Sequence, residues 1–205
     1  MRDEKINLLI ENLGLRNITG MYFKTFEEAK EKILELIQID STVGIGNSVT
    51  LKKMNISSEL IERGNTVFDK TTAKNNEESK KMKMKSLLAD WYISGTNGIS
   101  VDGHIVNMDH SGNRAAAMIY GPDNVIIVIG KNKISESLEE TIFRVRNIAS
   151  PMNARRAGLN PPCVEMNKCI DCKSKERVCN NLVIIEGQND ERRMIVLIVD
   201  EVEGF

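Results

Sequence analysis

Cysteine is absent from most of this chain, and histidine and aromatic residues are scarce. The 205 residues hold four cysteines, all between positions 163 and 179, and only two histidines. We can assign neither a catalytic triad nor a pair of catalytic carboxylates. Aromatic residues make up 4% and methionines number ten, which predicts an adaptable, mainly aliphatic interior. The hydrophobic content of 41% is enough for an ordinary globular core.

Net charge and long apolar runs are also missing. The 28 basic and 29 acidic residues nearly cancel, so no general field attracts nucleic acid or lipid headgroups. We interpret the basic run at 80–85 as a solvated helix face. No stretch approaches the ~18 apolar residues of a membrane span, and MRDEKINLLIENLG carries charges where a signal peptide needs an apolar run. We therefore expect a cytoplasmic protein without nucleic-acid or membrane partners.

The four cysteines form the clearest chemical pattern. Cys163, Cys169, Cys172 and Cys179 have the spacing C-x5-C-x2-C-x6-C within residues 161–181, a segment with two leading prolines, many charges and few apolar side chains. Because this segment cannot bury enough surface to hold itself still, we expect a cross-link or a bound metal to fix it. In a reducing compartment grouped cysteines more often bind metal than form disulfides. Metal binding is the first prediction, with redox-active free thiols and structural disulfides as alternatives.

The spacing favours iron–sulfur chemistry over zinc. Structural zinc sites usually combine two close C-x2-4-C pairs, whereas here only Cys169 and Cys172 form such a pair. A cubane cluster presents four separated iron corners to four thiolates and tolerates less regular spacing. We predict a [4Fe–4S] cluster, with Zn as the alternative, and interpret Glu165 and Asp171 as solvated loop carboxylates.

Helical and strand patterns alternate along the chain. Packing helices are predicted at 3–15 and from Thr25 to about 37, the second with a capping box completed by Glu28. Strands are predicted at 41–46, 66–68, 87–94, 124–130 and in LVIIE and MIVLIVDEV, with helices beginning near 47 and at 57–63, 73–86 and 137–149 and a hairpin turning at Asp102-Gly103. The helix at 137–149 is expected to point Leu138, Ile142, Val145 and Ile148 inward. Such alternation predicts an α/β fold with a mainly parallel sheet and a ligand site at the C-terminal strand ends.

The glycine-rich loop GIGNSVT follows the first of these strands. Its glycines let the backbone turn tightly and approach a ligand, and a hydroxyl can cap a helix whose N-terminus attracts anions. The loop lacks the lysine of a P-loop and the third glycine of a dinucleotide fingerprint. A tight strand-to-helix turn without ligand is therefore an equal alternative. The candidate ligand-binding residues here are Gly44, Gly46, Asn47, Ser48 and Thr50.

A second glycine-bearing loop, DHSGNR, also leads into a predicted helix. Arg114 offers a bidentate fork for an anion, and Asn113 lies beside it. An arginine at a helix start opposes the helix dipole unless a ligand or a carboxylate compensates it. Asn97, in the strand-end segment SGTNG, joins the predicted ligand-binding set. Arg155 and Arg156 either reach the same small anion or cap the helix before them.

These residues carry a resemblance that extends over nearly the whole chain. The segments VGIGNSVTL, SGTNGISVDGHIVNMDHSGNRAAAMIYGP, VIIVIGKNKI, RVRNIASPMNARRAG and PCVEMNKCIDCKSKERVCNNLVII resemble the LUD-domain family (lactate utilisation, formerly DUF162), in its small cysteine-containing branch. The resemblance implies one three-layer α/β domain of the NagB/RpiA/CoA-transferase type over 1–205, with N-terminal helices in 1–40 and a cysteine-rich metal loop at 161–181. The resemblance also implies that the genes of relatives are associated with genes of iron–sulfur proteins that oxidise lactate.

The chain departs from the enzymes of that wider superfamily. Coenzyme-A transferases use a glutamate nucleophile, and SGTNG contains none. Asp102, Asp109 and Lys131 are available for isomerase chemistry but do not match the isomerase pattern.

Two hypotheses of function follow. The first is a cluster-bearing enzyme or electron-transfer component that acts on a small, hydroxy-acid-type anion and works with a redox partner protein. The second is a non-catalytic subunit in which Zn or Fe–S only staples the cysteine loop and presents a surface to a partner protein. The first predicts that the cysteines and the glycine loops surround one cleft, and the second predicts a metal far from any pocket. Either is compatible with an oligomer.

Overall fold

The computed structural model describes residues 4–205, and its centre is a six-stranded sheet in which every neighbouring pair of strands is parallel. The strands follow the order β1 (Thr19–Phe23), β10 (Met194–Val199), β7 (Asn124–Gly130), β4 (Trp91–Ser94), β2 (Thr42–Ile45) and β3 (Thr66–Asp69). The central strands β7 and β10 are almost unbroken runs of buried aliphatic residues. Such runs are typical of parallel strands that are covered on both faces.

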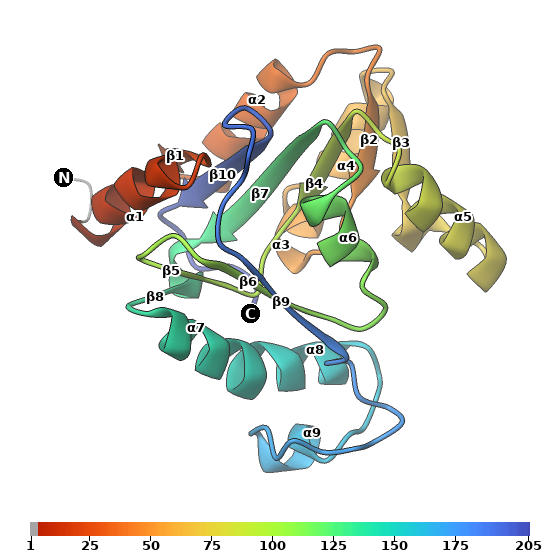
Figure 1. Cartoon of the computed structure of the whole chain (residues 1–205). Helices are drawn as coiled ribbons and strands as arrows, with labels where there is room; N and C mark the ends of the chain where they lie inside the picture. Colours follow the sequence, from red (N-terminus) through yellow and green to blue (C-terminus); the bar gives the residue numbers. More distant parts are fainter. Residues whose placement is uncertain (1–3) are drawn as a thin grey trace.

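Helices cover both faces of this sheet, so the domain has three layers (Figure 1). One face carries α2 (Phe26–Leu36), α3 (Val49–Lys53) and α4 (Ile56–Glu62), and the other carries α1 (Glu4–Leu15) and α6 (Asn113–Ile119). Ile33 and Leu60 are buried on the first face and Leu9 on the second. A further helix, α5 (Asn76–Ser86), packs at the β3 edge. The predicted α/β architecture is confirmed, and none of the helices in residues 4–205 is both long and apolar enough to cross a membrane.

A smaller mixed sheet, which the sequence pattern did not reveal, lies beside the large one. Its strand order is β8 (Ile134–Ser135), β5 (Gly98–Ser100), β6 (Ile105–Asp109) and β9 (Asn181–Ile185). The predicted hairpin at Asp102-Gly103 joins β5 and β6, and Gly103 supplies a φ of +88° at the turn. The segment LVIIE becomes β9 and pairs antiparallel with β6 instead of joining the parallel sheet.

One long helical segment packs against the smaller sheet, as Figure 1 shows below β5, β6 and β9. It consists of α7 (Leu138–Arg144), a π turn (Val145–Ala149) and α8 (Ser150–Arg156). Pro151 has no N–H to donate to the preceding turn, and Ser150 Oγ instead donates to the Val145 carbonyl at 2.7 Å. The wider turn breaks the 3.6-residue period. Val145 is buried as predicted, but Ile148 is 46% exposed, so its predicted inward orientation is wrong.

Other boundaries also need correction. Residues 1–40 do not hold helices alone, because β1 lies between α1 and α2 and pairs with β10. The sequence gives little signal for β1, a short and only half-buried edge strand. The strand predicted at 87–94 is confined to its second half, since Leu88 is 86% exposed in a turn. Residue 3, where the first helix was predicted to begin, lies outside the described residues.

Candidate anion cleft and cysteine site

A cleft with a cavity volume of about 230 Å³ opens at the edge where the parallel strands end. Its wall includes residues that lie within three positions after the ends of four strands: Asn47 and Ser48 after β2, Lys70 after β3, Gly95, Thr96 and Asn97 after β4, and Lys133 after β7. The segment from Met108 to Arg114 and the end of α8 complete most of the wall. Parallel α/β sheets place their ligand sites at this edge, as the sequence predicts for this chain.

The first glycine loop contributes two of its five predicted residues to the cleft, Asn47 and Ser48. Ser48 caps α3, with its Oγ accepting from the Leu51 N–H at 3.4 Å. Gly44 and Gly46 do not line the cleft. A Cβ at Gly44 would lie 2.8 Å from Ser86 Cβ, and one at Gly46 would collide with the Ser94 hydroxyl. Close packing against neighbouring elements therefore explains both glycines.

Arg114 lines the cleft, but its guanidinium is engaged within the protein. Its Nε donates to Asp109 Oδ1 at 2.8 Å, one terminal nitrogen donates to Asn97 Oδ1 at 2.5 Å, and the other donates to the Gly95 carbonyl at 3.2 Å. Asp109 Oδ2 also accepts from the Ala115 N–H at 2.8 Å. The charge at the start of α6 is thus compensated by a carboxylate, and Arg114 ties the loop after β4 to the end of β6. The sequence predicted a free guanidinium that would bind an anion, whereas in the structure the Arg114 guanidinium is bonded within the protein.

Positive charge dominates the cleft. Among the described residues that line it, Asp109 is the one carboxylate side chain, and the cationic side chains are Lys70, Lys83, Arg114, Lys133 and Arg156. Arg156 reaches in from α8 and donates to Asn47 Oδ1 at 3.2 Å. Its neighbour Arg155 instead donates to the Val164 carbonyl and to Asn167 Oδ1. The two arginines that the sequence could not separate therefore have different surroundings.

Lys133 is the most deeply buried of these cations, with 4% of its surface exposed. Its Nζ donates to the Thr96 carbonyl at 3.2 Å, and no carboxylate within the described residues forms an ion pair with it. Burial lowers the pKa of Lys133 to about 8, and the nearby Arg144 and Arg114 cations act in the same direction. Burial also lowers the pKa of Lys70 and that of Arg156. Charged amines and guanidinium groups that are held away from water attract an anion strongly.

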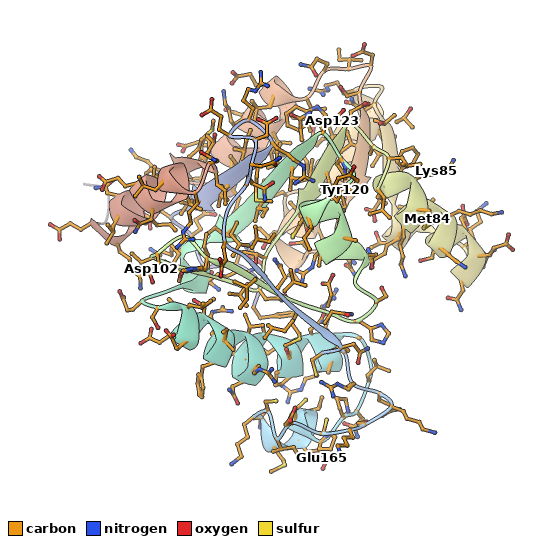
Figure 2. All side chains as sticks on the ribbon, viewed as in Figure 1. Met84, Lys85, Asp102, Tyr120, Asp123 and Glu165 are labelled. Carbon is orange, nitrogen blue, oxygen red and sulfur yellow. The ribbon has the colours of Figure 1, made fainter. Side chains whose placement is uncertain are left out.

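The four cysteines come together around a second, smaller cavity of about 20 Å³. In the loop 161–181 the structure has one short helix, α9 (Cys163–Met166). Arg177 donates to the carbonyls of Cys172 and Cys179, at 3.0 Å and 2.6 Å, and so holds two parts of the loop together. Glu165 lies on α9 at the outer edge of the molecule (Figure 2) and does not line this cavity.

The four thiols and the residues around them decide how well either predicted metal fits. Burial raises the pKa of the Cys163 thiol, and the charges of the other three cysteines raise it further. Yet no three His, Cys, Asp or Glu side chains in residues 4–205 are placed to hold a single metal ion. Zinc needs its sulfurs at about 2.3 Å from one point, whereas a cubane takes thiolates at four separated corners. Arg146 and Arg177 line the same cavity and offset thiolate charge. The four thiols therefore stay a predicted metal site, with a [4Fe–4S] cluster as the first prediction and zinc as the alternative.

The cleft and the cysteine cavity are neighbours. Met108, on β6, lines both of them. Val178 lines the cleft while Arg177 and Cys179, on either side of it, line the cysteine cavity. The Asn180 N–H donates to the Asp109 carbonyl at 3.0 Å, which attaches the end of the cysteine loop to the cleft wall.

Comparison with known families identifies the chain. The model of the LUD domain matches residues 6–199. This chain belongs to the LUD-domain family. Among curated proteins, none matches the LUD-domain chain significantly.

One solved structure shares the fold over nearly the whole chain. A DUF162 family protein from Deinococcus radiodurans, solved by crystallography at 1.70 Å resolution, superposes with a TM-score of 0.55 and 15% identity, covering 96% of each chain. A ribose 5-phosphate isomerase A from Methanocaldococcus jannaschii gives a TM-score of 0.38 and 15% identity, covering 64% of the LUD-domain chain and 65% of the isomerase. The first likeness supports the three-layer fold alone.

Sequence reasoning missed several residues of the LUD-domain cleft. Asn97, Asn113 and Arg114 do line it, together with Asn47 and Ser48, while Thr50 is buried behind the wall. Lys70 and Lys133 were not singled out, although Lys70 directly follows β3 and Lys133 lies three residues after the buried strand β7, positions that could have marked them. Met108 gave no signal, because its importance depends on the cysteine loop that packs beside it. Whether the lining residues bind a ligand stays a prediction.

Proposed function

We propose that this LUD-domain protein binds a small hydroxy-acid-type anion in the cleft and a [4Fe–4S] cluster at Cys163, Cys169, Cys172 and Cys179, and that the two sites act together in a redox reaction. The shared wall at Met108 supports this proposal most directly, because a purely structural metal has no need to adjoin a charged cleft. The cluster, when bound, supplies one-electron transfer.

The chain's own residues account for binding of the anion. Arg156 and Lys133 offer positive charge and N–H donors to a carboxylate. Ser48 and Asn113 place a hydroxyl and an amide where a substrate hydroxyl group can bond. Arg114 keeps Asp109, Asn97 and Gly95 in fixed positions around the ligand. Met108 and Val178 form the apolar partition towards the cysteines.

The two neighbouring arginines provide the test of the cleft. Calorimetric titration with L-lactate should give 1:1 binding, and Arg156→Met should weaken it by about 1.5–3 kcal/mol, the range for a hydrogen bond to a charged group. Arg155→Met is the matched control and should leave the affinity unchanged, since Arg155 bonds to Val164 and Asn167 outside the cleft. Equal effects of the two substitutions would remove the case for this cleft.

The link between the sites needs a spectroscopic test. Protein purified anaerobically should be brown and contain about four irons. Adding L-lactate should change the electron paramagnetic resonance spectrum of the reduced cluster in the original protein and in Arg155→Met, but much less in Arg156→Met. A cluster whose spectrum ignores lactate, in protein that binds lactate, would show that the sites do not act together.

The exposed apolar residues of the cysteine loop favour a second candidate function, that of a metal-stapled subunit. Met166, at the end of α9, is 49% exposed, and Ile170, which lines the cysteine cavity, is 45% exposed. A redox or regulatory partner protein could dock on them. A metal-loaded protein that binds neither lactate nor another small carboxylate would favour this alternative.

A further inference from the structure

The contacts of one buried amine in the cleft reveal no role for it in stabilising the fold. Lys133 follows β7 in a short helical turn, Lys131–Lys133, and its side chain is 4% exposed while still lining the cleft. It makes one hydrogen bond, to the Thr96 carbonyl, and joins none of the ion pairs found in residues 4–205. Lysines are almost never fully buried unless they are paired.

We propose that Lys133 captures a 2-oxo acid by forming an imine with its keto group. This inference rests on the proposed anion cleft and deepens it, since a 2-oxo acid is the oxidised counterpart of a 2-hydroxy acid. The carboxylate of the ligand lies against the cationic wall that includes Arg156, and the keto carbon faces the Lys133 amine.

The surroundings of Lys133 suit a nucleophilic amine. Arg144 on α7 and Arg114 on α6 are the nearby cations that disfavour its protonation, and Glu203 near the C-terminal end is the acidic group that opposes them. Glu203 is itself paired with Lys53 at 2.5 Å. A lysine that is desolvated beside other cations keeps part of its amine neutral near neutral pH, which is the form that attacks a carbonyl.

The chain beyond β10 passes close to the Lys133 amine. Gly204 has a φ of +68° and lies over Lys133, where a Cβ would stand 3.1 Å from Nζ and 3.2 Å from Thr50 Oγ1. The Thr50 hydroxyl is buried and has no hydrogen-bond partner within the described residues. An unpartnered buried hydroxyl calls for an explanation, and this one lies beside the same glycine as the Lys133 amine.

The covalent step balances without a further reactant. The neutral amine adds its electron pair to the keto carbon, and a proton moves from nitrogen to the carbonyl oxygen to give a carbinolamine. Loss of that oxygen as water leaves the carbon–nitrogen double bond. The reverse reaction with water releases the 2-oxo acid unchanged.

Reductive trapping with pyruvate tests the proposal. The full-length protein is incubated with pyruvate and sodium cyanoborohydride at pH 8, digested, and mapped by mass spectrometry. We expect a 1-carboxyethyl group on Lys133, and its yield should fall at least tenfold when excess L-lactate occupies the cleft. Lys131→Met, which removes the lysine at the other end of the same short turn and outside the cleft wall, is the matched control and should leave the yield at Lys133 unchanged.

Lys133→Arg separates this proposal from the proposed function, because arginine keeps the positive charge but cannot form the imine. This variant should still bind L-lactate and should show no labelled residue in the cleft. Label that is absent from Lys133, or spread over exposed lysines, in protein that binds lactate would overturn the imine and leave the anion cleft intact. Loss of both lactate binding and labelling in the original protein would overturn both. Circular dichroism checks folding, and Lys133→Met repeats the labelling test if the arginine does not fit.

Discussion

The cleft and the cysteine loop lie side by side but are held in different ways. The cleft wall is attached to the ends of parallel strands, and Arg114, Asp109 and Asn97 fix one another there by hydrogen bonds. The loop 161–181 has one short helix, and its buried residues are Pro161, Cys163 and Val178. The fold alone therefore shapes the cleft, whereas we expect the cysteine loop to depend on what its sulfurs bind.

Removing one sulfur should have the largest effect, and it tests whether the two sites are held independently. Cys169→Ser should abolish binding of the cluster, and the loop should then be cut rapidly by proteases because little core holds it. Binding of L-lactate in the cleft should persist. Iron analysis, limited proteolysis and calorimetry measure the three effects.

Asp171→Asn is the control for that change. Asp171 lines the cysteine cavity at a φ of +50°, a conformation that asparagine also tolerates, and is interpreted as a solvated carboxylate. The control should keep its iron. If the Cys169→Ser protein loses lactate binding together with the cluster, the two sites are not held independently.

Removing Arg114 should damage the preformed site most. Asp109 has 8% of its side chain exposed, so Arg114→Met leaves a buried carboxylate without its partner. Breaking a buried pair in this way costs about 3–5 kcal/mol of unfolding free energy. Urea denaturation measures it, with the more exposed Arg155→Met expected to change stability by less than about 0.5 kcal/mol. A small loss in Arg114→Met would mean that Arg114 is free for a ligand after all.

Lys133 should make the free energy of unfolding increase with pH above about 8. Its pKa is about 8 in the folded protein, below the 10.5 of an ordinary lysine. Between these values the unfolded chain binds more protons, so unfolding free energy should rise as pH increases from about 8 to about 10.5. The rise should approach about 3 kcal/mol at 1.36 kcal/mol per pKa unit. Urea denaturation at several pH values should show that Lys133→Met lacks this gain; equal slopes in both proteins would contradict it.

The smallest predicted effect concerns the glycine loop. Gly46→Ala pushes a methyl group into the Ser94 hydroxyl between two strands and should cost about 1–3 kcal/mol by overpacking. Gly14→Ala on α1 is the control, because nothing lies within 4 Å of its added Cβ, and it should stabilise the protein by about 0.5–1 kcal/mol. Thermal unfolding measures both. An unaffected Gly46→Ala protein would mean that the loop moves freely and tolerates the added methyl group.

The predictability of the fold differed between its two sheets. The runs at 124–130 and 194–199 are apolar enough to be recognised as buried parallel strands. The segment LVIIE looks the same in composition, yet β9 pairs antiparallel with β6. Nothing local distinguishes these cases, because a strand's partner depends on which segment packs beside it. The π turn before Pro151 likewise moved Ile148 outward despite a regular sequence period.

For the candidate site, the sequence indicated the edge and some of the residues but not their roles. Asn47, Ser48, Asn97, Asn113 and Arg114 all line the cleft. Arg114 was expected to face an anion, but its donors are taken by Asp109, Asn97 and backbone carbonyls. Arg155 and Arg156 are adjacent and chemically identical, so only their positions on α8 could separate them.

The sequence by itself determined the family, the α/β alternation and the grouping of four thiols, because these depend on residue type and on spacing along the chain. The tertiary structure decided that Lys133 is buried beside the cleft and that Met108 separates this cleft from the cysteines. Both facts depend on which distant segments meet. The same contacts set the local dielectric and the charges around each group. Those quantities are set by packing in three dimensions and have no local counterpart in the order of residues.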